Sequence, residues 1–246
     1  MNLIIDQGNT SVKVALFEDD KVCEVRSFEN SSIDELKNYI THLNYQSAIY
    51  SSVSLQNEEI KRVISEKTSN FITLSHQTKL PIAIEYATPH TLGVDRIAGA
   101  VGAWEVNPFF STLIIDAGTA ITYDFITAEG VYKGGNIAPG ISIRFKSLNS
   151  FTKSLPLVEA SSQYPQLGND TVSAILSGVM SGVVYECEGY ITKISKKIPD
   201  IKVIITGGDH KLLYNQLKNS TFVSLIDEEY LVLKGLNAIL RYNVKE

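Results

Sequence analysis

The sequence has few cysteines and no long run of apolar residues. Its two cysteines among 246 residues, Cys23 and Cys187, lack the close spacing of a metal-binding pair, and we expect both to be reduced thiols. No apolar stretch approaches the length of a membrane span, and the first residues lack a basic segment followed by a long apolar one. We therefore expect a cytoplasmic protein with no membrane partner.

An excess of positive charge is also missing. Lysine and arginine number 22 against 27 aspartates and glutamates, which gives a net charge of -5. Nucleic-acid-binding domains usually carry a basic surface, so we expect no nucleic-acid partner. The 44% content of hydrophobic residues is typical of a globular protein, and the length is sufficient for two lobes that share a cleft.

One short motif occurs twice in the chain. Leu-Ile-Ile-Asp, followed by any residue and then glycine, is found at residues 3–8 and 113–118, so that the two aspartates are 110 residues apart. This separation indicates the duplication of a whole half-domain. The alternative is a chance match between two apolar strands, and the shared Asp-x-Gly ending favours duplication. Alternating residues follow each copy, so each copy predicts a β-hairpin whose turn contains Gly8 or Gly118.

The remaining elements follow from residue spacing. Apolar periodicity predicts helices over residues 33–43, 57–67, 94–106 and 172–194. Ser32 and Glu35 have the spacing of a capping box, and residues 203–206 form a further strand. Two copies of strands and helices predict an α/β fold of two lobes, residues 1–108 and 109–246, with a boundary near the Asn107-Pro108 turn.

The duplicated turns have a chemistry suited to phosphate. A glycine turn exposes backbone N–H groups, and a neighbouring hydroxyl adds a donor, so the two together can cradle phosphate oxygens. Asp6 and Asp116 can hold the cations that neutralise the phosphates, and Lys13 adds positive charge. The alternative is that both glycines are ordinary hairpin residues and both aspartates turn formers. The matched pair favours two loops that bind a triphosphate from both lobes.

This pattern resembles the superfamily of acetate kinase, sugar kinases, heat-shock ATPases and actin. The resemblance rests on the two Asp-x-Gly loops and on Thr206-Gly207-Gly208, which is similar to the superfamily's adenosine-side motif. It implies two duplicated ribonuclease H-like (actin-like ATPase) lobes with a nucleotide cleft between them.

The segment around residue 95 is more specific. Gly93 precedes the helix predicted over 94–106, and Asp95 lies in its first turn, where the helix dipole favours an acid. A structural role is therefore sufficient to explain Asp95. Arg96 is different, because a cation in the first turn opposes the dipole. A planar guanidinium suited to binding a carboxylate would explain its presence.

At this point the chain closely resembles the type III pantothenate kinases. The matching motifs are Asp6 to Thr10, Tyr86 with Pro89, Gly93 to Arg96, Asp116 to Ala120, Gly134 to Gly140 and Gly168 to Thr171. They occur in the family's order across nearly the whole chain. Thr88 replaces the usual Asn and Val94 the usual Ala, and neither change removes a charged group.

The resemblance implies a role for individual residues. Asp95 would be the base that receives the proton of the pantothenate primary alcohol. Pantothenate would be bound by Tyr86, Gly93, Val94, Asp95, Arg96 and Thr171. ATP would be bound by Asp6, Gln7, Gly8, Asn9, Thr10, Ser11, Val12, Lys13 and Thr119. Asp116 would hold a monovalent cation.

The same resemblance implies an activity and partners. The expected reaction is ATP-dependent phosphorylation of pantothenate to 4'-phosphopantothenate, the first step of coenzyme A biosynthesis, with Mg²⁺ and with K⁺ or NH₄⁺. The expected assembly is a homodimer whose active site lies at or near the subunit interface. Two alternatives are another small-molecule kinase and a non-catalytic nucleotide-binding regulatory relative of the same fold. Against the latter, every charged group that the reaction needs is present.

Overall fold

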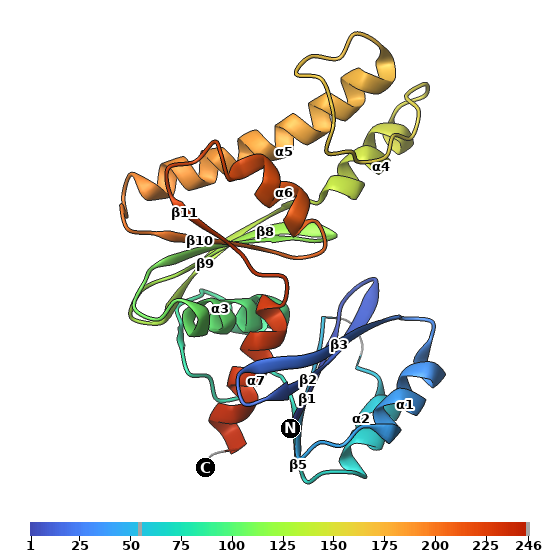
Figure 1. The fold of residues 1–246 in the computed structure, drawn as a ribbon, viewed down its shortest axis with the longest axis vertical. Coiled ribbons are helices and arrows are strands. Elements are labelled where there is room, and N and C mark those ends of the chain that lie inside the picture. The colour runs from blue at the N-terminus through green and yellow to red at the C-terminus, as the bar shows by residue number, and fades with distance from the viewer. Residues whose placement is uncertain (54–55, 245–246) are drawn as a thin grey trace. The chain divides into compact units, whose positions relative to one another are not determined.

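Two mixed β-sheets, of five and six strands, organise the chain in the computed structural model, which describes residues 1–53 and 56–244 (Figure 1). Five strands have the same order in both sheets. The chain divides into two units. Unit 1 contains residues 1–108, 130–132 and 230–246, and unit 2 contains residues 109–129 and 133–229.

The sheet of unit 1 has the order β3-β2-β1-β4-β5. Its strands are β1 (Asn2–Gln7), β2 (Ser11–Glu18), β3 (Lys21–Glu29), β4 (Ser47–Ser52) and β5 (Asn70–Thr73). Strand β2 runs antiparallel to β1 and β3, whereas β4 is parallel to β1 and to β5. The predicted first hairpin is thus confirmed.

Five strands of the second sheet repeat this arrangement in the order β9-β8-β7-β10-β11, and the short strand β6 (Ala83–Ile84) adds a sixth beside β9. The five are β7 (Thr112–Ala117), β8 (Ala120–Ile126), β9 (Val131–Pro139), β10 (Lys202–Thr206) and β11 (Ser224–Asp227). Strand β8 is antiparallel to β7, and β10 is parallel to both β7 and β11. Equivalent strands in equivalent order confirm the predicted duplication of a ribonuclease H-like lobe.

Helices cover both faces of the sheet in unit 1 (Figure 1). Helices α1 (Ile33–His42) and α2 (Glu58–Ser65) lie on one face, where apolar residues of β1 and β2 pack against them. Helices α3 (Val94–Val106) and α7 (Leu231–Val244) lie on the other. The helices predicted over 33–43, 57–67 and 94–106 are confirmed.

The predicted capping box at Ser32 is wrong. Ser32 has the dihedral angles φ -95° and ψ 43°, outside the extended region of an N-cap, and its side chain caps no N–H group. The first helical bond comes from its backbone instead, since the Ser32 carbonyl oxygen accepts the Leu36 N–H at 3.1 Å.

The C-terminal helix belongs to unit 1, although the sequence analysis assigned residues 230–246 to the second lobe. Helices α3 and α7 approach each other closely at two glycines. A β-carbon on Gly235 would overlap the Ala98 carbonyl oxygen, and one on Gly102 would overlap that of Leu231. This contact of backbone with backbone holds α7 in unit 1. Residues 245–246 lie outside the described part of the chain.

Three helices pack on the sheet of unit 2. They are α4 (Ile141–Phe151), α5 (Thr171–Ser195) and α6 (His210–Leu217), and they share one apolar core with β7, β8 and β10. The helix predicted over 172–194 and the strand over 203–206 are confirmed. Two further short elements lie in unit 1: β6 (Ala83–Ile84), which pairs in parallel with Val131 and Tyr132, and a 3₁₀ turn, η1 (Pro89–Thr91). Among the helices described, none has the length and apolar character needed to cross a membrane.

Candidate active site

The first candidate phosphate loop is the turn between β1 and β2. Asp6 lies directly opposite Lys13 in the antiparallel ladder, so the two side chains lie on the same face of the sheet. The turn closes through the Gly8 N–H, which donates to the Ser11 carbonyl oxygen at 2.9 Å. Asn9 and Thr10 form its exposed tip. A carboxylate, a cation and exposed amides therefore lie at one end of the hairpin.

Two predicted ATP-binding side chains point into unit 1 instead of to solvent. Val12 is fully buried in the core. Gln7 is nearly so, and its Oε1 accepts a hydrogen bond from the Tyr50 hydroxyl, which in turn accepts the Asn57 N–H at 3.0 Å. The side chains of Gln7 and Val12 therefore belong to the interior of unit 1. Tyr50, which the sequence analysis missed, ties the end of β1 to the start of α2.

A side chain outside the hairpin also holds the first loop. The Asn30 Nδ2, directly after β3, donates to the carbonyl oxygens of Gly8 at 3.1 Å and of Asn9 at 2.9 Å. Sequence reasoning did not find Asn30, because no local pattern marks an asparagine 21 or 22 residues from its partners.

The second candidate loop, between β7 and β8, is one residue shorter. Gly118 N–H donates to the Ala120 carbonyl oxygen at 3.0 Å, and Asp116 lies opposite Thr122, so no lysine occupies the place that Lys13 has in the first hairpin. The Thr119 carbonyl oxygen accepts the Gly140 N–H at 3.1 Å at the start of α4. A β-carbon on Gly140 would overlap that oxygen, so glycine is required there.

The predicted adenosine-side motif packs against the second loop within unit 2. Gly207 has a φ of +92°, and a β-carbon there would overlap Asp116 Oδ1 and the Ala117 carbonyl oxygen. Two residues on, the Asp209 N–H donates to the Ala117 carbonyl oxygen at 2.9 Å. Burial raises the pKa of the Asp209 carboxyl above its usual value. The structure therefore brings this turn into contact with Asp116 and Ala117, three and two residues before Thr119.

Each strand-end aspartate has a hydroxyl-bearing neighbour on the adjacent parallel strand. Ser51 of β4 is in register with Asp6, and Thr206 of β10 is in register with Asp116. Carboxylate and hydroxyl oxygens are hard donors that suit Mg²⁺ or K⁺. Among the residues described, no group of three or more His, Cys, Asp or Glu side chains could hold a metal alone. The donor set fits a cation that substrate phosphates and water also coordinate.

The acceptor segment lies in unit 1, at the start of α3. Gly93 is the N-cap residue, and Asp95 Oδ1 accepts the Arg96 N–H at 2.8 Å. A β-carbon on Gly93 would overlap this same carboxylate oxygen, so the missing side chain leaves the space in which Asp95 lies. Arg96 is only 8% exposed, although it carries a charge in the first turn of a helix.

Neighbouring residues hold this segment in place. Val94 is buried, and the His76 imidazole bonds through Nε2 to the Leu92 carbonyl oxygen at 2.8 Å, one residue before Gly93. The half-buried Tyr86 lies at a ring-centroid distance of 6.2 Å from Tyr132. His76 has a supporting position that no spacing in the sequence indicated.

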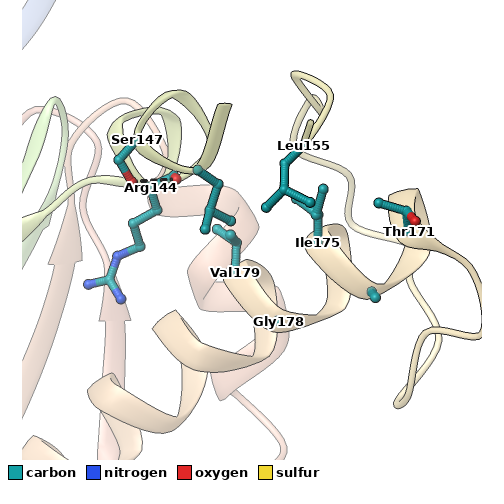
Figure 2. A pocket seen from close by; sticks show the side chains of 9 residues that line it. Arg144, Ser147, Leu155, Thr171, Ile175, Gly178 and Val179 are labelled. Atoms are coloured by element: carbon teal, nitrogen blue, oxygen red, sulfur yellow. Dashed lines mark hydrogen bonds between the residues drawn. The ribbon is translucent and has the colours of Figure 1, made fainter. Parts of the chain in front are cut away.

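Thr171, the remaining predicted acceptor residue, lies in unit 2. It begins α5 directly after the N-cap Asp170, which forms a capping box with Ser173. Thr171 lines a groove of about 650 Å³ between α4 and α5. In Figure 2 it lies at one end of the groove and Arg144 at the other, with Leu155, Ile175 and Val179 between them. The groove therefore joins an apolar wall to two polar ends.

The predicted residues are thus divided between the two units. Unit 1 holds the first loop and the segment from Tyr86 to Arg96, and unit 2 holds Asp116, Thr119 and Thr171. Each group contains residue types that could bind phosphate, a cation or a carboxylate.

Comparisons with known proteins show what the whole chain is similar to. The sequence profile of the type III pantothenate kinase family matches residues 2–193. A type III pantothenate kinase of Phocaeicola vulgatus is 43% identical over 245 residues, which cover 100% of both chains. Among solved structures, a conserved protein assigned to the Baf family of transcriptional activators from Campylobacter jejuni aligns with a TM-score of 0.64 at 23% identity, over 99% of this chain and 100% of that one.

A protein assigned as a 2-dehydro-3-deoxygalactonokinase from Sinorhizobium meliloti aligns with a TM-score of 0.63 at 13% identity, over 99% of both chains. These two similarities show the two-lobed fold of actin-like ATPases and kinases. The sequence match goes further and shows the family. The chain belongs to the type III pantothenate kinase family.

Proposed function

We propose that this chain transfers the γ-phosphoryl group of ATP to the primary alcohol of pantothenate, which gives 4'-phosphopantothenate for coenzyme A synthesis. The observation that carries the proposal is the 43% identity to a type III pantothenate kinase over the full length of both chains. The motifs of both phosphate loops and of the acceptor segment all lie within that match.

Asp95 is the proposed catalytic base. A carboxyl group with a pKa near 4 is too weak a base to ionise an alcohol before the reaction. In a loose phosphoryl-transfer transition state the proton leaves late, so a carboxylate need only orient the hydroxyl and then accept its proton. The proposal is supported by the position of the Asp95 carboxylate in the space beside Gly93, at the start of α3.

Arg96 is the proposed partner of the pantothenate carboxylate. Its guanidinium can form two parallel hydrogen bonds with a carboxylate, and burial strengthens such a pair. Tyr86, Gly93, Val94 and Thr171 complete the proposed acceptor site. Val94 is buried, so its backbone is the part that can contact pantothenate.

The two loops are the proposed phosphate site. In the first, within the proposed ATP-binding segment from Asp6 to Lys13, the backbone N–H groups of Asn9 and Thr10 and the side chains of Thr10, Ser11 and Lys13 would contact the phosphates. In the second, Thr119 would bind a phosphate. ATP carries Mg²⁺ into the reaction, and Asp116 would hold K⁺ or NH₄⁺. The chemistry supplied by these cations is the neutralisation of charge on the phosphates.

A homodimer in the cytoplasm is the proposed assembly. Gly178, Gly182, Tyr185 and Gly189 recur at intervals of three and four residues along α5, and thus share one face. Tyr185 is 60% exposed, and a β-carbon on any of these glycines would meet no described atom within 4 Å apart from the neighbouring backbone of α5 itself. Such a face lets a second helix approach closely. Light scattering should give twice the chain mass of 27.1 kDa.

Two other functions would use the same fold. Another small-molecule kinase would release ADP with a different acceptor, and a regulatory relative would bind nucleotide without turnover. The charged residues Asp6, Lys13, Asp95, Arg96 and Asp116 are all present, which favours catalysis.

The test is ADP release from MgATP, with and without pantothenate, in potassium and in sodium buffer. Release that requires both pantothenate and potassium is expected. Asp95→Asn should abolish turnover while MgATP still binds. Asp34→Asn is the matched control, because Asp34 is also the second residue of a helix and loses the same dipole interaction far from the acceptor segment. Turnover by the Asp95→Asn variant would contradict the assignment of the base.

A further inference from the structure

The carbonyl groups of the first phosphate loop converge on a single nitrogen atom. Asn30 Nδ2 donates to both the Gly8 and the Asn9 carbonyl oxygens, at 3.1 and 2.9 Å. Only the NH₂ end of the amide can take this position, since a carboxamide oxygen would be repelled by two carbonyl oxygens. One side chain therefore holds two consecutive peptide groups.

Because each peptide group is planar, this contact also fixes the direction in which two backbone N–H groups point. The described peptide bonds are all trans, so each N–H points away from the carbonyl oxygen of its own peptide group. The Gly8 carbonyl shares a peptide with the Asn9 N–H, and the Asn9 carbonyl shares one with the Thr10 N–H. With both oxygens turned toward Asn30, both N–H groups face the opposite side.

These two N–H groups are available to a ligand. Asn9 and Thr10 are exposed, and within the described chain no backbone carbonyl accepts a hydrogen bond from either N–H. Successive N–H groups that face one side form an anion-binding concavity. A hydrogen bond to the carbonyl end of a peptide also polarises its N–H end, which strengthens the donor.

The second loop provides an independent observation. The residue after its glycine, Thr119, corresponds to Asn9 in the duplicated motif, and its carbonyl oxygen is also tied, by the Gly140 N–H. The equivalent carbonyl group is thus held in both loops. A side chain, that of Asn30, holds it in the first loop, and a backbone N–H group, that of Gly140, holds it in the second. Hairpin formation alone does not require this second tie, because Gly8 and Gly118 already close their turns with Ser11 and Ala120.

We infer that Asn30 is a positioning residue of the first phosphate loop, whose amide turns the Asn9 and Thr10 N–H groups toward a phosphate of the nucleotide. This inference rests on the proposed assignment of that loop to ATP. Asn30 itself acts from behind the loop, through the two peptide groups that it holds.

The test uses Asn30→Asp, which keeps the shape of the side chain, removes the donor and places negative charge against both carbonyl oxygens. Titration calorimetry would measure the dissociation constants of MgATP, MgADP and adenosine. Those of MgATP and MgADP should rise by about tenfold or more, because hydrogen bonds to a charged phosphate are lost. That of adenosine should change by less than about twofold, as it has no phosphate.

Asn243→Asp is the matched control. The Asn243 Nδ2 also lies in unit 1 and also donates to two backbone carbonyl oxygens, those of Lys79 at 3.0 Å and Ile239 at 2.8 Å. This variant should lose about as much thermal stability as Asn30→Asp does, but it should keep the wild-type affinity for MgATP. Asn30→Ala removes the donor without adding charge and serves where the aspartate variant does not fold.

The outcomes separate two failures. The inference is overturned if a folded Asn30 variant binds MgATP as tightly as the wild type does. It is also overturned if the affinity for adenosine falls as much as that for MgATP, or if neither Asn30 variant folds. A wild-type chain that binds MgATP but releases no ADP with pantothenate overturns the proposed function and leaves the role of Asn30 intact.

Discussion

The carboxylate of Asp95 occupies the space beside Gly93 that a β-carbon on residue 93 would fill. The glycine therefore does more than begin a helix, for which serine or aspartate would serve better. It allows the carboxylate to fold back over the first turn, where Oδ1 accepts the Arg96 N–H. The position of the proposed base depends on the absence of a side chain two residues earlier.

Gly93→Ala should reduce kcat by about 10- to 100-fold, because the added carbon would overlap Asp95 Oδ1 and must displace the carboxylate. A small displacement of a catalytic group is enough to slow the reaction by this much. MgATP should bind as before, since the first loop is not touched. Gly99→Ala is the control on the same helix. A β-carbon there meets no described atom within 4 Å apart from the neighbouring backbone of α3 itself, so turnover should persist. Steady-state kinetics of both variants would decide, and unchanged kcat in Gly93→Ala would contradict the proposed contact.

Gly207→Ala should destabilise unit 2 and weaken nucleotide binding. An alanine at a φ of +92° costs about 1–2 kcal/mol in the backbone alone. Its β-carbon would also displace the side chain of Asp116, the proposed cation ligand. Denaturant unfolding and MgATP titration would measure both effects. Gly208→Ala, next in the chain and with no described atom within 4 Å of a β-carbon, should change the unfolding free energy by less than about 0.5 kcal/mol. Equal changes of the unfolding free energy in the two variants would refute this explanation.

Much of the fold could be predicted because its signals are local. The strands β1 and β7 are short apolar runs that end in Asp-x-Gly, and α3 has the bounds that apolar spacing predicts. The duplication could be predicted for the same reason, because the repeated residues are adjacent in the sequence, at residues 3–8 and 113–118. The equivalent order of the two sheets is its structural consequence.

The missed features depend on contacts between residues far apart in the sequence. Asn30 and Tyr50 stand in no motif, and their partners in the first loop are 21 to 43 residues away. Helix α7 returns to unit 1 because Gly102 and Gly235 let two backbones touch, and neither glycine marks that contact locally. The Ser32 capping box had the right residues, but backbone dihedral angles kept its side chain from the N–H groups.

The two cysteines should differ sharply in reactivity. Burial raises the pKa of the Cys187 thiol from 9.0 to about 11, so that at pH 8 only about one molecule in a thousand carries the reactive thiolate there. Cys23 is exposed. A thiol-specific chromogenic reagent should therefore modify one group per native chain and two per unfolded chain. Cys23→Ser should leave no reactive group in the native state, and two rapidly reacting native thiols would contradict the burial of Cys187.

The same raised pKa predicts how stability depends on pH. The folded chain holds the Cys187 proton more tightly than the unfolded chain does, so this thiol contributes stability that is fully present below pH 9. The contribution is lost as the pH rises from about 9 toward about 11. Cys187→Ala should therefore lose less stability than the wild type between pH 8 and pH 10.5 when both are unfolded in urea. Parallel pH profiles of the two proteins would show that the thiol is not held in its neutral form by the fold.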